Sequence, residues 1–464
     1  MATSFDLSTP RRVHLVGIGG AGMSGIARIL LTRGHRVSGS DLSDGRALDA
    51  LRALGAVVTI GHTADAIGDA EVVVRSTAVP AGNPELRAAA EAGLLVLPRA
   101  EMLAACMAGE RAVLVAGTHG KTTTTSMVVI GLQAAGLDPS FAIGGALNEV
   151  GTNAHAGVDA LFVAEADESD RSLLAYQPDL ALVTNVELDH PDTYDSPDQV
   201  AAVFDEFLRR RAARAPALVC LDDPGSAALG ERAHGPVVTY GATAGADWRL
   251  VLGRDGATLR HAGSDVAPLA LAVPGRHNLV NAAGAIAACA LMGGDPEAAA
   301  RGLATFTGAQ RRFQRLGTAA GVAVVDDYAH HPTELAATLA AARTEGHDHI
   351  VLVVQPHRYS RTAVFGDALG AAAAAAEVII VTEVYGAGEQ PIPGVSGRTV
   401  ADAAERAGAV VVHAPHIEEA VDAVMDHARP GTLVLVTGAG DVTRVGPAVL
   451  ERLRAGPGGP GAGP

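Results

Sequence analysis

Two glycine turns in this chain have the residue types and spacing that bind phosphate groups. The central turn is Gly117-Thr118-His119-Gly120-Lys121-Thr122-Thr123, which follows the apolar run 112–116 and precedes an apolar-periodic segment over 127–132. Backbone N–H groups at a junction of strand, turn and helix bind a polyphosphate, Lys121 reaches its terminal phosphates, and the Thr122 hydroxyl binds Mg²⁺. The sequence therefore predicts a phosphate-binding loop here.

Lys121 is the only lysine of the chain, because the other 34 of its 35 Lys and Arg residues (35 minus 1) are arginine. A compact ammonium differs chemically from a planar guanidinium, which favours a functional lysine over one retained by chance. The turn departs from the pattern GxxxxGK[ST], because Val115 stands where the first glycine is expected.

The N-terminal turn starts at Gly17 and reads Gly-Ile-Gly-Gly-Ala-Gly after the apolar strand 13–16. A GxGxxG pattern with an acidic residue about 20 positions on, here Asp41, is typical of nucleotide-binding turns. The turn suits a diphosphate and Asp41 suits a ribose hydroxyl, so any nucleotide diphosphate fits. His62 lies in a Gly-His-Thr loop and is either a base contact or a solvated loop residue.

Carboxylates follow two further apolar strands. Glu165 comes directly after the run 161–164 and precedes Asp167, Glu168 and Asp170, while the polar segment 185–190 follows the strand 180–184. Ligands of open α/β sheets bind outside the carboxyl ends of strands, and carboxylates beside a triphosphate hold Mg²⁺. We expect Glu165 to bind the metal, whereas metal binding and solvation both remain open for the other three.

Polar groups also mark the C-terminal half. Asn278 and Asn281 share one face of a helix that opens near residue 276. They either read an adenine edge or cap the helix, and capping is slightly favoured. Arg358 and Arg361 follow the strand 350–354, and their spacing suits a carboxylate or a phosphate.

The composition is that of a globular protein. Its 464 residues suggest about three domains, and the net charge of -16 argues against nonspecific nucleic-acid binding. The three cysteines lack metal-type spacing and are expected to be reduced core residues of a cytoplasmic protein. The first dozen residues lack an apolar signal core, and no run approaches 18 apolar residues, so we expect neither secretion nor membrane insertion.

Short apolar strands alternate with helical segments along the chain, which predicts an α/β fold. The expected domains are residues 1–107, 108–314 and 315–454, followed by a Gly/Pro-rich disordered tail over 455–464. A hairpin is expected over 249–260, around Asp255-Gly256.

Four motifs resemble those of the Mur ligase family. They are Gly-Ile-Gly-Gly-Ala-Gly-Met-Ser-Gly (17–25), Gly-Thr-His-Gly-Lys-Thr-Thr-Thr (117–124), Glu-Ala-Asp-Glu-Ser-Asp (165–170) and Asp-Asp-Tyr-Ala-His-His-Pro (326–332). The resemblance covers nearly the whole chain and accounts for Val115, because this family uses a shortened phosphate loop. It implies a Rossmann-like N-terminal domain, a central P-loop ATPase α/β domain and a C-terminal Rossmann-like domain.

The resemblance also implies roles for individual residues. It implies a UDP-sugar site formed by Gly17, Gly19, Gly20, Gly22, Met23, Asp41, His62, Ser76 and Thr77. It implies an ATP site formed by Gly117, Thr118, His119, Gly120, Lys121, Thr122, Thr123, His277, Asn278, Asn281 and Arg312. It implies the metal ligands Thr122, Glu165 and His190, although a histidine on Mg²⁺ is unusual. It implies that the amino acid and the reacting carboxylate are framed by Tyr328, His330, His357, Arg358 and Arg361.

The implied activity is an ATP- and Mg²⁺-dependent ligase of peptidoglycan precursor synthesis. It would join L-alanine to the lactyl carboxylate of UDP-N-acetylmuramate through an acyl phosphate, with Lys121, His330, Arg358 and Arg361 as catalytic residues. His330 is a candidate base or a structural histidine. The alternatives are a murein tripeptide-recycling ligase of the same family, a nicotinamide-dependent oxidoreductase and a noncatalytic nucleotide-binding regulator. The chain is expected to lack the carbamylated lysine of some sister ligases, and its oligomeric state, monomer or dimer, stays open.

Overall fold

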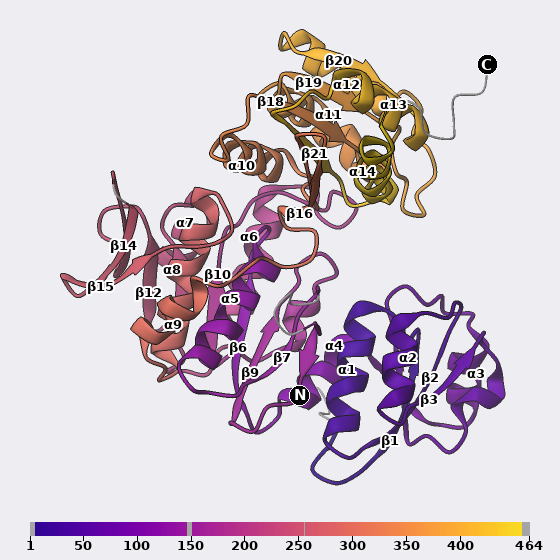
Figure 1. The fold of residues 1–464 in the computed structure, drawn as a ribbon. Coiled ribbons are helices and arrows are strands. Elements are labelled where there is room, and N and C mark those ends of the chain that lie inside the picture. The colour runs from indigo at the N-terminus through magenta and orange to yellow at the C-terminus, as the bar shows by residue number, and fades with distance from the viewer. Residues whose placement is uncertain (1–4, 146–150, 255, 457–464) are drawn as a thin grey trace. The chain divides into compact units, whose positions relative to one another are not determined.

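The computed structural model describes residues 5–145, 151–254 and 256–456. The chain is an α/β protein with three sheets made mostly of parallel strands, as the sequence predicts (Figure 1). Within the described ranges, no helix combines the length and the apolar character needed to cross a membrane.

The first sheet is entirely parallel and has the strand order β3-β2-β1-β4-β5. Its strands are β1 (Arg12–Val16), β2 (Arg36–Asp41), β3 (Val57–Ile60), β4 (Val72–Arg75) and β5 (Leu95–Pro98). Its helices are α1 (Ala21–Thr32), α2 (Arg46–Ala53), the 3₁₀ helix η1 (Ala64–Ile67), α3 (Pro84–Glu91) and α4 (Arg99–Met107). The strand order reverses at β1, and open α/β sheets bind ligands at such a switch point.

The second sheet has ten strands in the order β15-β14-β13-β12-β11-β10-β6-β9-β7-β8. Its strands are β6 (Arg111–Ala116), β7 (Ser140–Ala142), β8 (Ala154–His155), β9 (Leu161–Glu165), β10 (Leu180–Val183), β11 (Ala217–Cys220), β12 (Val237–Gly241), β13 (Trp248–Gly253), β14 (Gly256–His261) and β15 (Ser264–Leu269). Its helices are α5 (Lys121–Ala134), the 3₁₀ helix η2 (Ser172–Ala175), α6 (Pro197–Arg209), α7 (Pro224–Arg232), α8 (Arg276–Leu291) and α9 (Pro296–Leu303). The antiparallel pair β13 and β14 confirms the predicted hairpin.

The third sheet has the order β16-β17-β21-β18-β19-β20, with only β16 antiparallel to its neighbour. Its strands are β16 (Gln314–Ala319), β17 (Val322–Asp327), β18 (His349–Val354), β19 (Val378–Val381), β20 (Val410–His413) and β21 (Thr432–Thr437). Its helices are α10 (Pro332–Arg343), α11 (Tyr359–Ala373), α12 (Gly397–Arg406), α13 (Ile417–His427), the 3₁₀ helix η3 (Asp441–Arg444) and α14 (Val445–Ala455).

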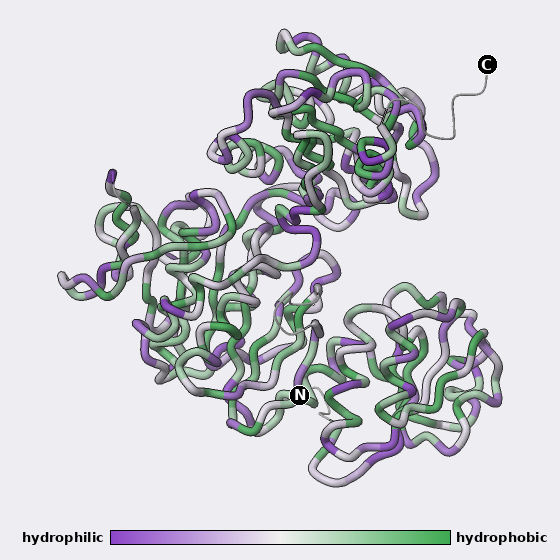
Figure 2. Tube along the Cα trace, viewed as in Figure 1, coloured by the Kyte–Doolittle hydropathy of each residue, from purple (hydrophilic) through white to green (hydrophobic). Residues whose placement is uncertain are grey.

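Alternate strand residues place a separate apolar core on each face of the third sheet. Leu352 packs in a cluster with residues of α10, α11 and α12, whereas its neighbours Val351 and Val353 pack with α13 and α14. This two-residue period is expected where helices cover both faces of a sheet. Figure 2 shows hydrophobic residues concentrated along the strands and many hydrophilic residues in the connecting loops.

The end of the chain differs from the prediction. Residue 455 was expected to begin the disordered tail, but α14 continues through Ala455. Val449 and Leu450 are buried, and Arg452 and Arg454 in the last turn favour the helix C-terminus electrostatically. The rest of the predicted tail, from residue 457, lies outside the described residues.

By its internal contacts the chain divides into two compact units. The first unit holds the first two sheets. The second unit holds the third sheet together with the segments 188–199 and 271–279.

Candidate active site

The N-terminal glycine turn joins β1 to α1. The N–H groups of Gly17 and Ile18 donate to the Ser40 carbonyl at 2.8 and 3.0 Å, and Gly17 has a φ of 80°, which suits glycine. The Gly19 N–H donates to Asp41 Oδ2 at 2.9 Å, so this carboxylate braces the turn. A Cβ on Gly19 would lie 2.9 Å from the same oxygen, so a side chain there would displace the Asp41 carboxylate.

A cleft of about 800 Å³ lies over this turn. It is lined by six of the nine residues predicted to bind the UDP-sugar: Gly17, Gly19, Gly20, Asp41, His62 and Ser76. Gly22, Met23 and Thr77 are not among its lining residues. Met23 is only 1% exposed because its side chain packs into the apolar core, and Gly22 lies against Arg99.

His62 is not a solvated loop residue, because it belongs to a buried polar network that the sequence did not indicate. Its Nδ1 lies 2.7 Å from Glu85 Oε1 and 3.0 Å from Ser40 Oγ, while His14 Nε2 lies 2.7 Å from Glu85 Oε2. Burial would raise the pKa of Glu85, but hydrogen bonds from His14, Ser40 and His62 outweigh burial and lower it. Glu85 is therefore an ionised carboxylate behind the cleft.

The central turn joins β6 to α5, and it has the strand, turn and helix that a phosphate loop needs. The helix begins at Lys121, several residues before the apolar-periodic segment that indicated it. Gly117 has a φ of 139°, and a Cβ there would lie 2.0 Å from Thr184 Oγ1. Gly120 has a φ of 79°. The sequence Gly-x-x-Gly therefore sets the backbone path of this turn.

Lys121 points back into the turn. Its Nζ donates to the Gly117 carbonyl at 2.7 Å and to Glu168 Oε2 at 2.7 Å. Burial would lower the pKa of Lys121, but Glu168 and then Asp167 raise it above its ordinary value. The ammonium is therefore held charged, and Glu168, which the sequence left open, is 1% exposed and serves as its ion-pair partner.

Thr122 and Glu165 lie together, as the sequence predicts. Thr122 Oγ1 donates to Glu165 Oε2 at 3.1 Å, and the Gly144 N–H donates to Glu165 Oε1 at 2.7 Å. Burial raises the pKa of Glu165, an effect that a bound cation would reverse. A hydroxyl and a carboxylate are hard oxygen donors of the kind that Mg²⁺ prefers, so this pair fits the predicted metal.

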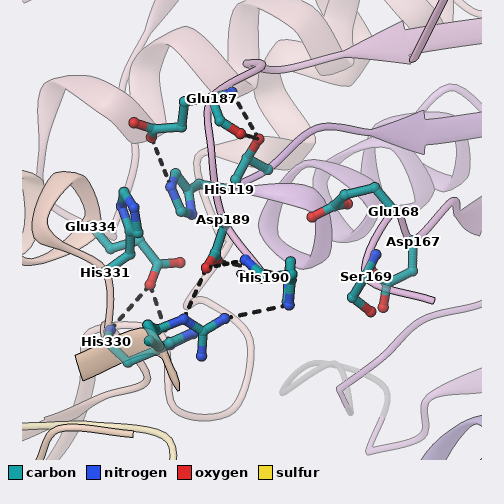
Figure 3. Close-up of polar contacts among 12 residues, drawn as sticks. His119, Asp167, Glu168, Ser169, Glu187, Asp189, His190, His330, His331 and Glu334 are labelled. Atoms are coloured by element: carbon teal, nitrogen blue, oxygen red, sulfur yellow. Dashed lines mark hydrogen bonds and ion pairs between the residues drawn. The ribbon is translucent and has the colours of Figure 1, made fainter. Parts of the chain in front are cut away.

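The end of β10 braces the central turn. The His119 N–H donates to Asn185 Oδ1 at 2.7 Å, and the His119 ring lies 2.8 Å from Glu187 (Figure 3). The Thr118 hydroxyl donates to the Glu187 carbonyl and accepts from the Glu187 N–H. Asn185 and Glu187 therefore support the central turn. The sequence showed them only as part of a polar segment after a strand.

The other predicted ATP residues are divided between the two units. Thr123 is buried in the first turn of α5, and Asn281 lies beside Gly120, 3.3 Å from where a Cβ would be. Asn278 and Asn281 are the third and sixth residues of α8, so neither is the N-cap that was slightly favoured. Asn278 instead donates from Nδ2 to the Pro274 carbonyl at 2.6 Å.

In the second unit, His277 and Arg312 accompany Glu334. Burial and then Arg312 lower the pKa of His277 to about 4, so this ring is neutral at pH 7. Arg312 pairs with Glu334 at 3.5 Å and lies over the Tyr328 ring, 5.1 Å from its centroid.

The residues expected to frame the amino acid lie close together in the second unit. His330 Nδ1 lies 2.9 Å from the Tyr328 carbonyl, and the rings of His330 and His357 are 5.7 Å apart. Burial lowers the pKa of His330 to about 4 and that of His357 to about 3. Both rings are therefore neutral at pH 7, a state in which a histidine can accept a proton.

Arg358 and Arg361 each donate to a carboxylate of the segment 188–199, one of which, Asp189, is labelled in Figure 3. Arg361 Nε donates to Asp189 Oδ1 at 2.8 Å, and Arg358 Nη1 donates to Asp192 Oδ2 at 2.6 Å. Asp189 has a lowered pKa because Arg361 outweighs its burial. His190 lies 3.4 Å from Arg361 in this second unit, whereas the predicted metal ligand Glu165 belongs to the first.

Fold and site together define an α/β protein with two glycine turns, each between a parallel strand and a helix. Three family models match consecutive parts of it: the Mur ligase family catalytic domain (12–111), the Mur ligase middle domain (115–289) and the Mur ligase glutamate ligase domain (311–440). A protein of Mycobacterium sp. (strain JLS) named UDP-N-acetylmuramate–L-alanine ligase is 49% identical, with 97% of this chain and 98% of the relative covered.

Solved structures agree with this match. The crystal structure of a UDP-N-acetylmuramate-alanine ligase from Thermotoga maritima aligns with a TM-score of 0.79 at 27% identity, covering 96% of this chain and 100% of that one. A murein peptide ligase from Psychrobacter arcticus shares the fold, with a TM-score of 0.70 at 22% identity and coverage of 96% and 99%. The chain belongs to the Mur ligase family.

Proposed function

We propose that this chain is an ATP-dependent ligase that joins L-alanine to the lactyl carboxylate of UDP-N-acetylmuramate, in peptidoglycan precursor synthesis. The observation that carries the proposal is the central turn, where a charged Lys121 and the Thr122–Glu165 pair converge on one phosphate-binding backbone. Relatives close to half identical over almost the whole chain carry the name of this activity. Because ATP is the energy source, we place the activity in the cytoplasm.

We propose that ATP binds at the central turn with Mg²⁺ held by Thr122 and Glu165. The cation would offset charge on the terminal phosphates of ATP. The α5 N-terminus and the backbone N–H groups of Gly117 to Thr123 would hold the phosphates, with Asn281 beside them. His277, Asn278 and Arg312 complete the proposed ATP set, and His190 remains a proposed further metal ligand.

We propose that the UDP part of the substrate lies in the N-terminal cleft. Its diphosphate would lie over the turn at Gly17, Gly19 and Gly20, and its ribose near Asp41. Ser76 lines the same cleft, and His62 would contact the base. The proposed domain limits are 1–107, 108–314 and 315–454, which the matched ranges 12–111, 115–289 and 311–440 support.

The chemistry requires activation, because a carboxylate and an amine do not condense readily in water. An oxygen of the lactyl carboxylate would attack the γ-phosphorus of ATP, forming an acyl phosphate and releasing ADP. Lys121 would stabilise charge on the transferred group. The neutral amine of alanine would then attack the acyl carbon and lose a proton, and the carbon–oxygen bond to phosphate would break, leaving an amide and inorganic phosphate.

We propose that Tyr328, His330, His357, Arg358 and Arg361 frame the alanine. His330 would accept the proton of the attacking amine, because burial leaves its ring neutral at pH 7 and so able to take a proton. Arg358 and Arg361 would orient the carboxylates of the substrates, a role they already perform toward Asp192 and Asp189.

The test is a mass-spectrometric assay of product with ATP, Mg²⁺, UDP-N-acetylmuramate and either L-alanine or a murein tripeptide. The proposal predicts an alanyl product and stoichiometric ADP. A product formed only from the tripeptide would favour the recycling ligase, the alternative to which the Psychrobacter arcticus structure corresponds. NADH binding in the N-terminal cleft without amide formation would instead favour the oxidoreductase.

A further inference from the structure

We infer that Glu85 is a positioning residue that fixes the tautomer of His62 and thereby makes the N-terminal cleft selective for uracil over cytosine. The inference rests on the proposed function, because it takes the nucleotide part of the substrate to occupy this cleft.

The sheet topology places a base near His62. In the first sheet, β1, β2 and β3 are neighbours and all parallel, so their carboxyl ends lie side by side at one edge. Gly17 follows β1, Asp41 ends β2 and His62 follows β3 by two residues. A diphosphate at the glycine turn and a ribose at Asp41 direct the base toward the end of β3, where His62 lines the cleft.

The hydrogen bonds around His62 determine which ring nitrogen carries the proton. Ser40 donates its single hydroxyl hydrogen to Glu85 Oε2 at 2.7 Å, so its oxygen faces His62 Nδ1 as an acceptor at 3.0 Å. Glu85 Oε1, also an acceptor, lies 2.7 Å from the same nitrogen. Nδ1 therefore carries the hydrogen, and in the neutral ring Nε2 is an acceptor. Nε2 makes no hydrogen bond to any residue that the structure describes.

The Glu85 carboxylate is held in the orientation that bonds His62 Nδ1. Its side chain is 0% exposed, and Oε2 also lies 2.7 Å from His14 Nε2, which is itself buried. Rotation of the carboxylate would leave buried donors on His14 and Ser40 without an acceptor. The Asn83 side chain caps α3 by accepting from the N–H groups of Glu85 and Leu86, which holds the backbone that carries the carboxylate.

A fixed acceptor at Nε2 discriminates between the two pyrimidines. Position 3 of uracil is an N–H donor, whereas position 3 of cytosine is an acceptor. The Nε2 lone pair would bind the former and repel the latter. A mismatch of this kind in a partly buried site lowers affinity by about tenfold or more.

The experiment compares the dissociation constants of UDP and CDP at pH 8, by calorimetry, for the intact chain and for Glu85→Gln. We expect the unmodified protein to bind UDP at least about tenfold more tightly than CDP. In Glu85→Gln the amide oxygen should face His14 and Ser40, because it can then accept from both of these donors. The amide NH₂ group then faces His62 Nδ1. The ring then donates from Nε2, and the UDP preference should fall to about unity or reverse.

Ser38→Ala is the matched control, because Ser38 bonds the far nitrogen of His14 and does not touch His62. It should leave the ratio of the two constants unchanged. Nitrogen-15 histidine spectra of the unmodified protein, with the His62 signal assigned by His62→Asn, read the tautomer without perturbing Glu85. A Glu85→Gln protein with the original ratio, or an Nε2–H ring in the unmodified protein, would overturn the inference. Failure of UDP to bind at all would overturn the proposed function instead.

Discussion

The two glycine turns of this chain share a backbone design, but the side chains that bond their backbones carry opposite charges. In each, a glycine with positive φ follows a buried parallel strand, and a helix begins a few residues later. The group that braces the N-terminal turn is a carboxylate, because Asp41 accepts from the Gly19 N–H. In the central turn an ammonium adds to the contacts from the end of β10, because Lys121 donates to the Gly117 carbonyl.

The charge of the bonding side chain suits the N-terminal turn to binding a phosphate and the central turn to transferring one. A carboxylate beside a turn cannot stabilise charge that develops on a phosphoryl group, so the N-terminal turn suits a diphosphate that stays intact. Under the proposed function, the central turn would supply a cation, Lys121, and hard oxygen donors for a metal where charge develops during phosphoryl transfer. Three predictions change one turn or the other, and a fourth extends the comparison to a buried histidine of the second unit.

The largest effect is expected for Lys121→Ala. Loss of the ammonium should lower the rate of amide formation at least about a hundredfold, because charge on the transferred group is no longer offset. Affinity for UDP-N-acetylmuramate should change less than about twofold, which calorimetry measures. Lys121→Arg should lower the rate of amide formation to a similar extent, since a planar guanidinium does not replace a compact ammonium. Unchanged turnover in either variant would break the distinction between the turns.

Glu165→Gln should have the next largest effect. The amide can still accept from Thr122 but carries no charge, so the Mg²⁺ concentration for half-maximal rate should rise about tenfold or more. The exposed Asp198→Asn, in the first turn of α6, is a charge-matched control and should leave the Mg²⁺ dependence as it was. An identical Mg²⁺ titration for Glu165→Gln would exclude this carboxylate as the metal ligand.

Asp41→Asn tests the N-terminal side. The variant weakens the brace on Gly19, so the dissociation constant for UDP-N-acetylmuramate should rise about tenfold while ATP affinity stays constant. Asp44→Asn changes another carboxylate that lines the cleft but is exposed and paired with Arg52, and it should have less than about a twofold effect. Equal effects of the two variants would show that overall charge, rather than the brace, determines binding.

The smallest effect concerns buried histidines, which extend the comparison to the second unit. Burial lowers the pKa of His330 to about 4, so its ring is neutral at pH 7, whereas Glu168 keeps the buried Lys121 charged. The unfolded chain, with an ordinary histidine pKa near 6.5, binds the proton more readily. This contribution to stability, on the order of 3 kcal/mol, is therefore complete above pH 6.5 and is lost as the pH falls toward 4.

Thermal unfolding between pH 7 and pH 4 measures this contribution. The melting temperature of the unmodified protein should fall more steeply with decreasing pH than that of His330→Gln, which has no ring to protonate. Parallel curves for the two proteins would contradict a neutral His330 and weaken its proposed role as a base.

The sequence predicted what depends on neighbours along the chain. Both glycine turns, the strands before them and the pairing of Thr122 with Glu165 could be predicted, because turns and strand ends have local signals. It did not predict the partners that determine the tautomer of His62 and the ion pair of Arg361. Glu85 reaches His62 across 23 positions, and Asp189 reaches Arg361 across 172, so only the folded chain brings them together.

Local sequence signals do not show which way a side chain faces. Met23 lies within the glycine motif and stays a predicted UDP-sugar residue, but the helix turns its side chain into the core. Asn278 and Asn281 were slightly favoured as caps because they are polar residues near a helix start, yet the helix begins before both. Motif membership thus indicates which segment lies near the ligand, but helical geometry decides which side chains face it.

Oxygen-18 in the lactyl carboxylate tests phosphoryl transfer most directly. UDP-N-acetylmuramate labelled with oxygen-18 in its lactyl carboxylate is incubated with the protein, ATP, Mg²⁺ and L-alanine, and the released phosphate is analysed by mass spectrometry. Attack of the carboxylate on the γ-phosphorus predicts one labelled oxygen in the inorganic phosphate and none in ADP. Amide formation with unlabelled phosphate would contradict phosphoryl transfer at the central turn.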